Sequence, residues 1–244
     1  YNKNELLQLP ENLNELVVGN RKLKVGHSID QFWLYQNEGV YAGDAEVPEV
    51  NGKKLSMSSI PFAKNDPKWK DQNGDNVIDD KDEVFLGKGG WYGAPFTLGI
   101  NFTTKWKNLT LFVLGTGNFG AYGLKNSSYY WVDGDDKYSA IVRNRWTPET
   151  AATATYPRLS ARSASNNFRA SDYWLYKTDR FDLAKVQITY DLPKRILRNT
   201  FINELSAYVS GANLLTISKE RKHMEMNVGS APQSRFYNIG VKAV

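Results

Sequence analysis

The sequence contains no cysteine and no long hydrophobic run, and each absence excludes a class of protein. Without cysteine there is no disulfide framework and no thiolate metal site. No window approaches the roughly 18 consecutive apolar residues that a membrane-spanning helix requires. A transmembrane β-barrel is not excluded, because its strands present apolar side chains to lipid at only every second position. Residues 1–4 lack the apolar segment of a signal peptide, so we expect a mature chain or a fragment.

The excess of positive over negative charge is also small. The formal net charge is +5, and the Lys and Arg residues are spread along the chain. The longest basic cluster is Arg21, Lys22 and Lys24, which we interpret as a solvated turn. The sequence therefore predicts no nucleic-acid partner.

Patterns that would indicate an enzyme are missing as well. His27 and His223 lie far apart, and neither has a neighbouring ligand at metal-site spacing. The glycine-rich stretch 87–93 has neither P-loop nor dinucleotide spacing. Acidic pairs such as Asp135 and Asp136 lie in polar segments, and nothing designates a carboxylate pair of the kind that glycoside hydrolases need. We predict that the protein is not an enzyme.

What the chain does have is a strand pattern. Within residues 96–106, four apolar side chains fall at even positions and would share one face of a strand: Leu98, Ile100, Phe102 and Trp106. Lys107-Asn108 predicts a two-residue turn, after which residues 109–120 return as a second strand. The opposite face of this return strand carries Phe112 and Leu114, so we expect something other than water to cover it there.

Further strands follow the same pattern. We predict strands at residues 180–191, 204–216 and 235–244, with weaker candidates at 31–41 and 1–9. In the first of these, Ala184, Val186, Ile188 and Tyr190 alternate with polar residues. Residues 193–199 predict at most one short helical turn.

The connections between strands alternate in length. Residues 107–108 and 192–203 are short, whereas three connections are long: about 42–95, 122–179 and 217–234. Short turns on one side and long loops on the other are typical of outer-membrane barrels, in which the short turns are periplasmic. The pattern predicts that all three long loops are extracellular. Residues 10–30 do not fit this pattern, because they would form a periplasmic turn that is longer than usual.

Residues 71–82, called the acidic loop, carry the one constellation with metal chemistry in it. Oxygen ligands fall at positions 1, 3, 5, 7, 9 and 12 of an EF-hand-type calcium loop, and the predicted ligands are Asp71, Asn73, Asp75, Val77 (through its carbonyl), Asp79 and Asp82. Ile78 occupies the position of the usual apolar anchor. The spacing predicts a structural Ca²⁺ and no organic cofactor.

Two features depart from the EF-hand rule. Position 6 is Asn76 rather than Gly, and position 12 is Asp82 rather than the longer Glu. No amphipathic helices flank the loop. The alternative is a polar turn without a metal, held by hydrogen bonds from side chains to the backbone.

Three tryptophans, Trp131, Trp146 and Trp174, lie among tyrosines in the second long connection. These indoles could stack on sugar rings. Alternatively, they form an aromatic girdle at the membrane interface or pack within the loop. We favour the girdle or the packing.

Several segments together resemble the SusC/RagA class of TonB-linked outer-membrane transporters, in the order and approximate spacing of that family. They are Val25–Tyr35, Glu38–Val40, Asp66–Asp75 with Ile78 and Asp79, Asn144–Glu149, Tyr156–Arg158 and Tyr208–Thr216. The match covers nearly the whole chain.

This resemblance implies an all-β fold and a transport function. Residues 1–244 would be the C-terminal part of an antiparallel transmembrane β-barrel of roughly 22 strands, with the plug and the TonB box outside this chain. Such a protein imports oligosaccharides or peptides through the bacterial outer membrane together with a SusD-like surface lipoprotein. TonB-ExbB-ExbD would act through the N-terminal part, while the remaining strands, the plug and outer-membrane lipid surround this portion. Members of the family usually end in an aromatic residue, so we expect one further residue, Phe, after Val244.

A second class of protein stays open on the residues alone. A secreted, calcium-dependent carbohydrate-binding β module would also account for the acidic loop and the tryptophan content.

Extraction behaviour separates these two classes. In water, the apolar faces of lipid-facing strands would be exposed, and the outermost strands would have unpaired edges. We therefore expect the intact protein to require detergent. The measurement is the partition of the protein between aqueous buffer and detergent extracts of cells. Recovery of folded protein in detergent-free buffer would contradict the barrel interpretation.

Overall fold

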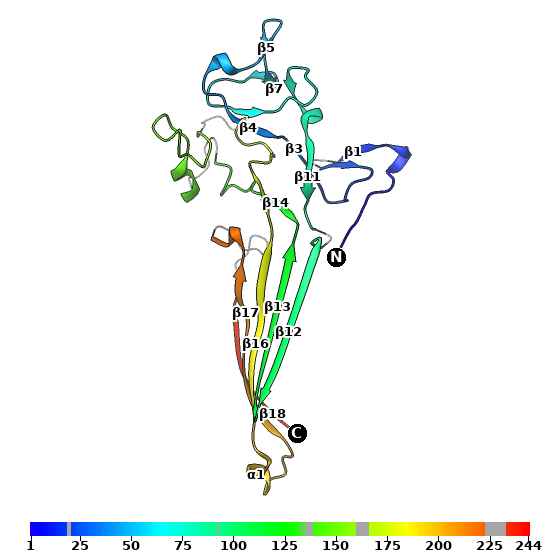
Figure 1. Cartoon of the computed structure of the whole chain (residues 1–244), viewed down its shortest axis with the longest axis vertical. Helices are drawn as coiled ribbons and strands as arrows, with labels where there is room; N and C mark the ends of the chain where they lie inside the picture. Colours follow the sequence, from blue (N-terminus) through cyan, green and yellow to red (C-terminus); the bar gives the residue numbers. More distant parts are fainter. Residues whose placement is uncertain (19–20, 92, 133, 135–138, 160–165, 223–232) are drawn as a thin grey trace. The chain divides into compact units, whose positions relative to one another are not determined.

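The computed structural model describes residues 1–18, 21–91, 93–132, 134, 139–159, 166–222 and 233–244 (Figure 1). They form two compact units. The sheet unit contains residues 1–3, 90–121 and 177–244, and the loop unit contains residues 4–89 and 122–176. No helix within the described ranges is long and apolar enough to cross a membrane.

The sheet unit is built on five antiparallel strands in the order β12-β13-β16-β17-β18. Their bounds are Phe96–Trp106, Leu109–Phe119, Arg180–Asp191, Leu205–Ile217 and Phe236–Ala243. Each agrees with a predicted strand to within one residue at either end. The alternation of apolar and polar residues was therefore sufficient to locate every strand of this sheet.

Both short connections lie at the same end of the sheet, where Figure 1 shows α1. Trp106 pairs directly with Leu109, which confirms the two-residue turn, and Lys107 has a left-handed φ of 53°. The second connection contains α1 (Lys194–Leu197), a single helical turn with Leu197 buried. The predicted helical turn is confirmed.

One face of the sheet is apolar and exposed across all five strands. A single row runs through paired residues Leu111, Ile188, Val209 and Ile239, which share a face because directly opposite residues point the same way. Ile239 is 84% exposed, and Ile188 and Val209 are each more than half exposed. A continuous apolar surface of this kind is not stable against water and matches the lipid-facing band of a barrel.

The opposite face is mainly polar. Thr103, Gln187, Ser210 and Asn238 lie at corresponding positions of four strands, with Phe112 between the first two. Phe112 is only half-buried, and the ammonium group of Lys185 lies 5.9 Å from its ring centre. An ion pair of 3.0 Å joins Lys105 and Asp191 on this face. The sheet is thus amphipathic.

A β-bulge corrects one detail of the predicted alternation. Ala184 is skipped in the pairing of β16 with β13, and the apolar face continues through Leu183 and Phe181. The sequence pattern had placed Ala184 on that face. Without the extra residue, Leu183 and Phe181 would turn to the polar side, because a one-residue shift exchanges the faces of a strand.

The loop unit consists of short strands in small sheets. The antiparallel pairs are β1 (Glu15–Val18) with β2 (Arg21–Lys24), β3 (Gln31–Leu34) with β11 (Val84–Lys88), β4 (Asn37–Val40) with β9 (Pro67–Trp69), and β5 (Glu49–Val50) with β6 (Lys53–Lys54). β7 (Ser56–Met57) lies between β8 (Ile60–Pro61) and the parallel β10 (Val77–Ile78), and β14 (Tyr122–Leu124) pairs with β15 (Leu175–Lys177). Single 3-10 turns occur at Pro10–Asn12, Asp44–Glu46, Asp80–Asp82 and Ala140–Asn144, and Lys219–Lys222 forms another in the sheet unit.

In the N-terminal part, one predicted strand is wrong and a second is interrupted. Residues 1–9 form no strand, and within them Leu6 exchanges backbone hydrogen bonds with Gly26 and His27. The predicted strand 31–41 divides at Tyr35 into β3 and β4, which pair with different partners. Neither segment joins the five-stranded sheet, so residues 10–30 need not be a periplasmic turn.

The loop unit has its own hydrophobic core. Seven buried side chains form it, with Tyr35 packed against them: Tyr41, Val47, Leu55, Met57, Phe62, Trp69 and Ile78. The members come from β7, β9 and β10, from residues 41–55 before β7, and from the segment between β8 and β9. The region predicted as a long loop at 42–95 is therefore a packed structure.

The exposed apolar face generates a prediction about neighbouring residues of β18. Ile239→Arg places a charge on the apolar face and should destabilise the membrane-inserted protein by about 2–4 kcal/mol. Asn238→Arg, one residue away on the opposite face, is the matched control and should cost far less. The measurement is the free energy of unfolding of the full-length protein in lipid vesicles. Equal effects of the two variants would contradict the assignment of the faces.

Candidate functional site

The acidic loop begins with a turn built around Asp71. The carboxylate of Asp71 accepts hydrogen bonds from the backbone N–H of Gly74 at 2.7 Å and of Asn76 at 2.8 Å. Gly74 and Asn76 have left-handed φ values of 77° and 65°. Asn76 thus takes the conformation for which an EF-hand loop uses Gly, as its tolerance of that region allows.

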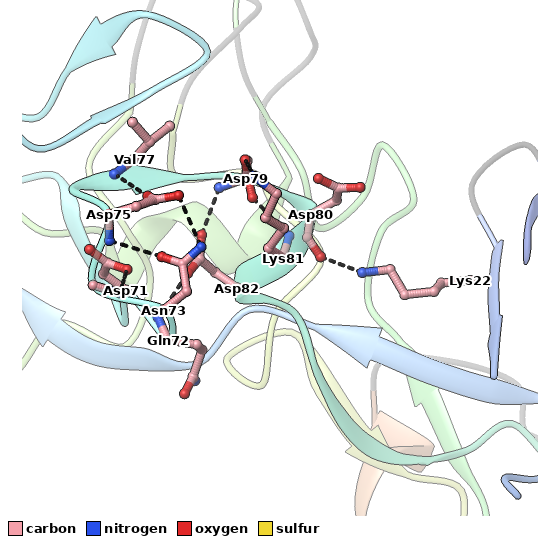
Figure 2. A network of polar contacts seen from close by, with 11 residues as sticks. Lys22, Asp71, Gln72, Asn73, Asp75, Val77, Asp79, Asp80, Lys81 and Asp82 are labelled. Carbon is pink, nitrogen blue, oxygen red and sulfur yellow. Dashed lines mark hydrogen bonds and ion pairs between the residues drawn. The ribbon is translucent and has the colours of Figure 1, made fainter. Parts of the chain in front are cut away.

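The middle of the loop is held by its own side chains (Figure 2). The N–H of Asp75 donates to Asn73 Oδ1 at 2.9 Å, and Asn73 Nδ2 donates to Asp75 Oδ2 at 2.9 Å. The N–H of Val77 donates to Asp75 Oδ1 at 2.9 Å. These short-range bonds are those of an Asx-type turn.

Asp82 closes the loop from inside the protein. Its side chain is fully buried, and its two oxygens accept the N–H groups of Gln72 and Asp79 at 2.8 Å each. Asp79 in turn accepts the N–H of Lys81 at 2.8 Å and caps the 3-10 turn Asp80–Asp82. A buried carboxylate is tolerated here because it is hydrogen-bonded at both oxygens.

Ile78 anchors the acidic loop, as predicted. Its side chain is 1% exposed and belongs to the core of the loop unit. Val77 and Ile78 pair in parallel with Ser56 and Met57, so the loop is attached through its backbone as well.

The six predicted calcium ligands share one loop, but their side-chain oxygens accept hydrogen bonds within the loop and do not converge on a metal position. Asp71, Asp75, Asp79 and Asp82 each accept at least one backbone N–H. Over the described part of the chain, no three His, Cys, Asp or Glu side chains come together as a group that could hold a metal ion. The hydrogen bonds of the metal-free alternative are present, and calcium binding stays a prediction that would require these side chains to rearrange.

Lys22 corrects the interpretation of the basic cluster as a solvated turn. Its side chain is buried, and its ammonium group donates to the carbonyl of Asp80 (Figure 2). The same ammonium group forms an ion pair of 3.0 Å with Glu83. Burial raises the pKa of Glu83, and the ammonium of Lys22 opposes that shift. Lys22 therefore attaches the β1-β2 hairpin to the end of the acidic loop.

A second candidate site is a pocket of about 200 Å³ within the loop unit, called the aromatic pocket. Aromatic and other apolar side chains form most of its wall: Val40, Pro67, Trp69, Trp146, Ala151, Ala154, Tyr156, Pro157 and Tyr173. Four polar residues complete it: Asn37, Asn65, Arg158 and Asn167. Its lining comes from both segments of the unit, which the sequence pattern did not bring together.

The predicted tryptophans divide between packing and the pocket. Trp174 is buried, lies 6.2 Å from Trp131 in an edge-to-face arrangement, and stacks on Phe168 at 6.0 Å. Loop packing is therefore confirmed for these two tryptophans. Trp146 instead lines the aromatic pocket.

His27 is the one histidine within the described residues, and it lies among aromatic side chains. His27 packs edge-on against Trp33 at 5.0 Å and contacts Phe85 at 4.7 Å, which is the environment of a packing residue. His223, Asp135 and Asp136 lie outside the described residues.

Comparison with known proteins gives consistent likenesses over this whole fold. No family model matches the chain. TonB-dependent receptor P26 of Formosa agariphila is 28% identical over 232 residues, which is 90% of this chain and 22% of the receptor. TonB-dependent receptor P3 of the same organism is 24% identical over 267 residues, covering 98% and 25%.

Solved structures of the RagAB peptide importer share the fold. One, in an open-open state, superposes with a TM-score of 0.71 at 19% identity, and another, described as the RagAB peptide transporter, does so with 0.71 at 21%. Both matches cover 98% of this chain and 25% of the other. The chain is similar in sequence to TonB-dependent receptors, and its fold is that of the RagAB importer over nearly its whole length.

The chain thus spans about a quarter of the length of the receptors it matches. The relatives are named as receptors and as a transporter or importer, and none of these names is that of an enzyme. Apart from Trp146, the residues of the aromatic pocket were missed by sequence reasoning. Four of the resembling segments contribute to its wall: Glu38–Val40, Asp66–Asp75, Asn144–Glu149 and Tyr156–Arg158. That these segments belong to the same family pattern was the available sequence signal for their lying close together.

The calcium prediction has a direct measurement. Adding millimolar Ca²⁺ to the chelator-treated full-length receptor should stabilise the loop unit by about 2.7 kcal/mol when the ion reaches a hundredfold excess over its dissociation constant. Double substitution Asp71→Asn with Asp75→Asn should abolish the effect, whereas Asp80→Asn should preserve it, because the Asp80 side chain is not a predicted ligand. Thermal unfolding measures the shift. No stabilisation, together with no anomalous scattering at the loop, would contradict calcium binding.

Proposed function

We propose that the chain is the C-terminal part of a TonB-dependent outer-membrane importer of oligosaccharides or peptides. One observation carries the proposal: a sheet with an exposed apolar face continuous over five strands, in a chain whose fold matches an importer over 98% of its length. A water-exposed surface of this composition would be unfavourable, and a lipid environment removes that cost.

In this proposal the sheet unit spans the bacterial outer membrane. The two short connections, with Lys107-Asn108 and α1, then face the periplasm, and the long connections that contain the loop unit face the outside of the cell. The remaining strands and the plug complete the barrel, since five strands have unpaired edges at β12 and β18.

The proposed partners follow from the same family. A SusD-like surface lipoprotein would act at the extracellular side, and TonB-ExbB-ExbD would supply energy through the N-terminal part of the protein. The solved relatives are named as the RagAB peptide importer, which supports peptide as one of the two proposed substrate classes and is a statement about that importer. A structural Ca²⁺ in the acidic loop is a further, separate proposal.

The transport proposal predicts a growth defect. Deleting the gene of the complete protein should abolish growth on one class of nutrient, either an oligosaccharide or a peptide, while growth on free monosaccharides and amino acids continues. The full-length gene should restore growth, and the same gene without its TonB-interacting segment should not. Growth on defined media and uptake of a labelled nutrient are the measurements. Full rescue by the TonB-deficient gene would contradict the mechanism.

A further inference from the structure

The end of the sheet unit that carries both short connections is basic. Of the two acids that flank residues 192–203, Asp191 forms the 3.0 Å ion pair with Lys105, and Glu204 is the other. The short connections themselves, residues 107–108 and 192–203, contain no acidic side chain and four cationic ones, called the basic end: Lys107, Lys194, Arg195 and Arg198. Positive charge is therefore in excess at this end.

The cations of the basic end are available to a partner. All four side chains are exposed. Among the described residues, none forms an ion pair or a hydrogen bond with the side chains of Lys194, Arg195 or Arg198. The ammonium group of Lys107 lies 4.9 Å from the ring centre of Trp106, an arrangement that leaves its charge unneutralised.

Two large apolar side chains are exposed in the same connection as three of these cations. Phe201 is 95% exposed, and Ile196, within α1, is 59% exposed. The N–H of Ile196 donates to the carbonyl of Pro193 at 2.9 Å, and the N–H of Thr200 donates to the carbonyl of the buried Leu197 at 2.9 Å. An ordered connection thus presents cationic and apolar groups side by side.

The apolar face of the sheet ends in aromatic residues next to the basic end. Trp106 pairs with Leu109, which pairs with Tyr190, so the three share one row of that face. Trp106 is 68% exposed and Tyr190 is 44% exposed. Trp and Tyr favour the boundary between hydrocarbon and water, because their rings are apolar and their N–H or O–H groups are polar. In the proposed membrane setting, this row marks that boundary.

The basic end then lies at the level of the lipid headgroups. α1 begins at Lys194, four residues after Tyr190, so the two Cα atoms are at most about 14 Å apart. The headgroup layer on each side of the hydrocarbon is roughly 5–8 Å thick. The long apolar stems of Lys and Arg let their charged ends reach back into that layer.

Charge and apolar exposure together favour one kind of partner. A zwitterionic lipid carries its own cation and would leave the positive charge of the basic end uncompensated. Free phosphate would supply the charge and leave Phe201 and Ile196 in water. An anionic phospholipid supplies both, since its phosphate lies directly above its acyl chains.

We propose that the basic end binds anionic phospholipids, of the phosphatidylglycerol type, in the leaflet that faces the periplasm. The inference rests on the proposed function, because only the membrane-spanning orientation brings the short connections to that leaflet. It assigns to these connections a lipid ligand, which fixes the depth of the sheet in the membrane.

Native mass spectrometry of the full-length receptor in uncharged detergent tests the proposal. The receptor is titrated with phosphatidylglycerol and with phosphatidylcholine of identical acyl chains. We expect tighter binding of phosphatidylglycerol. The triple variant Lys194→Gln, Arg195→Gln, Arg198→Gln should lose about tenfold or more of that affinity, because each cation near an anionic lipid surface contributes roughly fivefold. Its affinity for phosphatidylcholine should not change.

A matched control removes three charges from the opposite end of β16 and β17. It is the triple variant Lys177→Gln, Lys219→Gln, Lys222→Gln, whose lysines are exposed and belong to the sheet unit. This variant should keep the affinity of the wild type for phosphatidylglycerol. Equal losses in the two triple variants, or equal affinity of the wild type for the two lipids, would overturn the proposal.

Two soluble anions separate the lipid from other partners. Glycerol 3-phosphate offers a phosphate without acyl chains, and a polyglutamate peptide offers the carboxylates of an acidic protein. Neither should displace phosphatidylglycerol from the wild type. Displacement by glycerol 3-phosphate would indicate a site for free phosphate, and displacement by polyglutamate would indicate a protein-binding surface. Either result would contradict the proposal.

Failure of the lipid site and failure of the transporter remain distinguishable in this design. Outer-membrane insertion of each variant is measured by cell fractionation, and TonB-dependent uptake is measured with a labelled nutrient. A receptor that inserts and supports uptake without preferring phosphatidylglycerol contradicts only the lipid proposal. A preference for phosphatidylglycerol that depends on the basic end, without TonB-dependent uptake, contradicts only the transport proposal.

Discussion

The sheet unit depends on complete pairing of its backbone hydrogen-bonding groups. In the membrane setting proposed above, an unpaired N–H or C=O costs several kcal/mol, so the pairing in the order β12-β13-β16-β17-β18 has to be continuous along each strand. Only a maintained register keeps Leu111, Ile188 and Val209 on one face. The bulge at Ala184 shows the same constraint locally, because it sacrifices one position of pairing and keeps Leu183 on the apolar side. Register, more than any single side chain, makes this surface apolar.

The loop unit obtains its order differently, from carboxylates bonded to backbone N–H groups. Asp82 accepts two such groups within the acidic loop, and Asp66 accepts one while pairing with Arg158. Asp172 accepts the N–H of Asn37 at 2.9 Å, and burial raises the pKa of Asp172 despite that bond. Each carboxylate satisfies backbone groups that short strands leave unpaired. These acids therefore stabilise a region in which strands contain only two to five residues.

Long strands were predictable from the sequence and the architecture of the loop unit was not. The five long strands were located because period-two alternation persists over eight or more residues. Ala184 was misplaced because the register shift leaves no local mark in that alternation. The prediction of one continuous strand at 31–41 missed the break at Tyr35 for another reason. β3 pairs with β11 and β4 pairs with β9, and no short-range pattern specifies these partners. In the same way the acidic loop was recognisable from its local spacing, while the aromatic pocket joins distant segments.

The division of the loop unit into two stretches affects how the protein folds. The hairpin of β12 and β13 separates residues 4–89 from residues 122–176, and Asp66 and Arg158 are 92 positions apart. A hairpin with a two-residue turn forms in about 1–10 μs, whereas contacts over such separations carry a large loop-closure cost. The core around Trp69 lies within residues 41–78 and needs only the first stretch, whereas the ion pair of Asp66 with Arg158 closes only after the second stretch has been synthesised. The loop unit therefore forms in two steps, a local core first and the contacts between its two stretches afterwards.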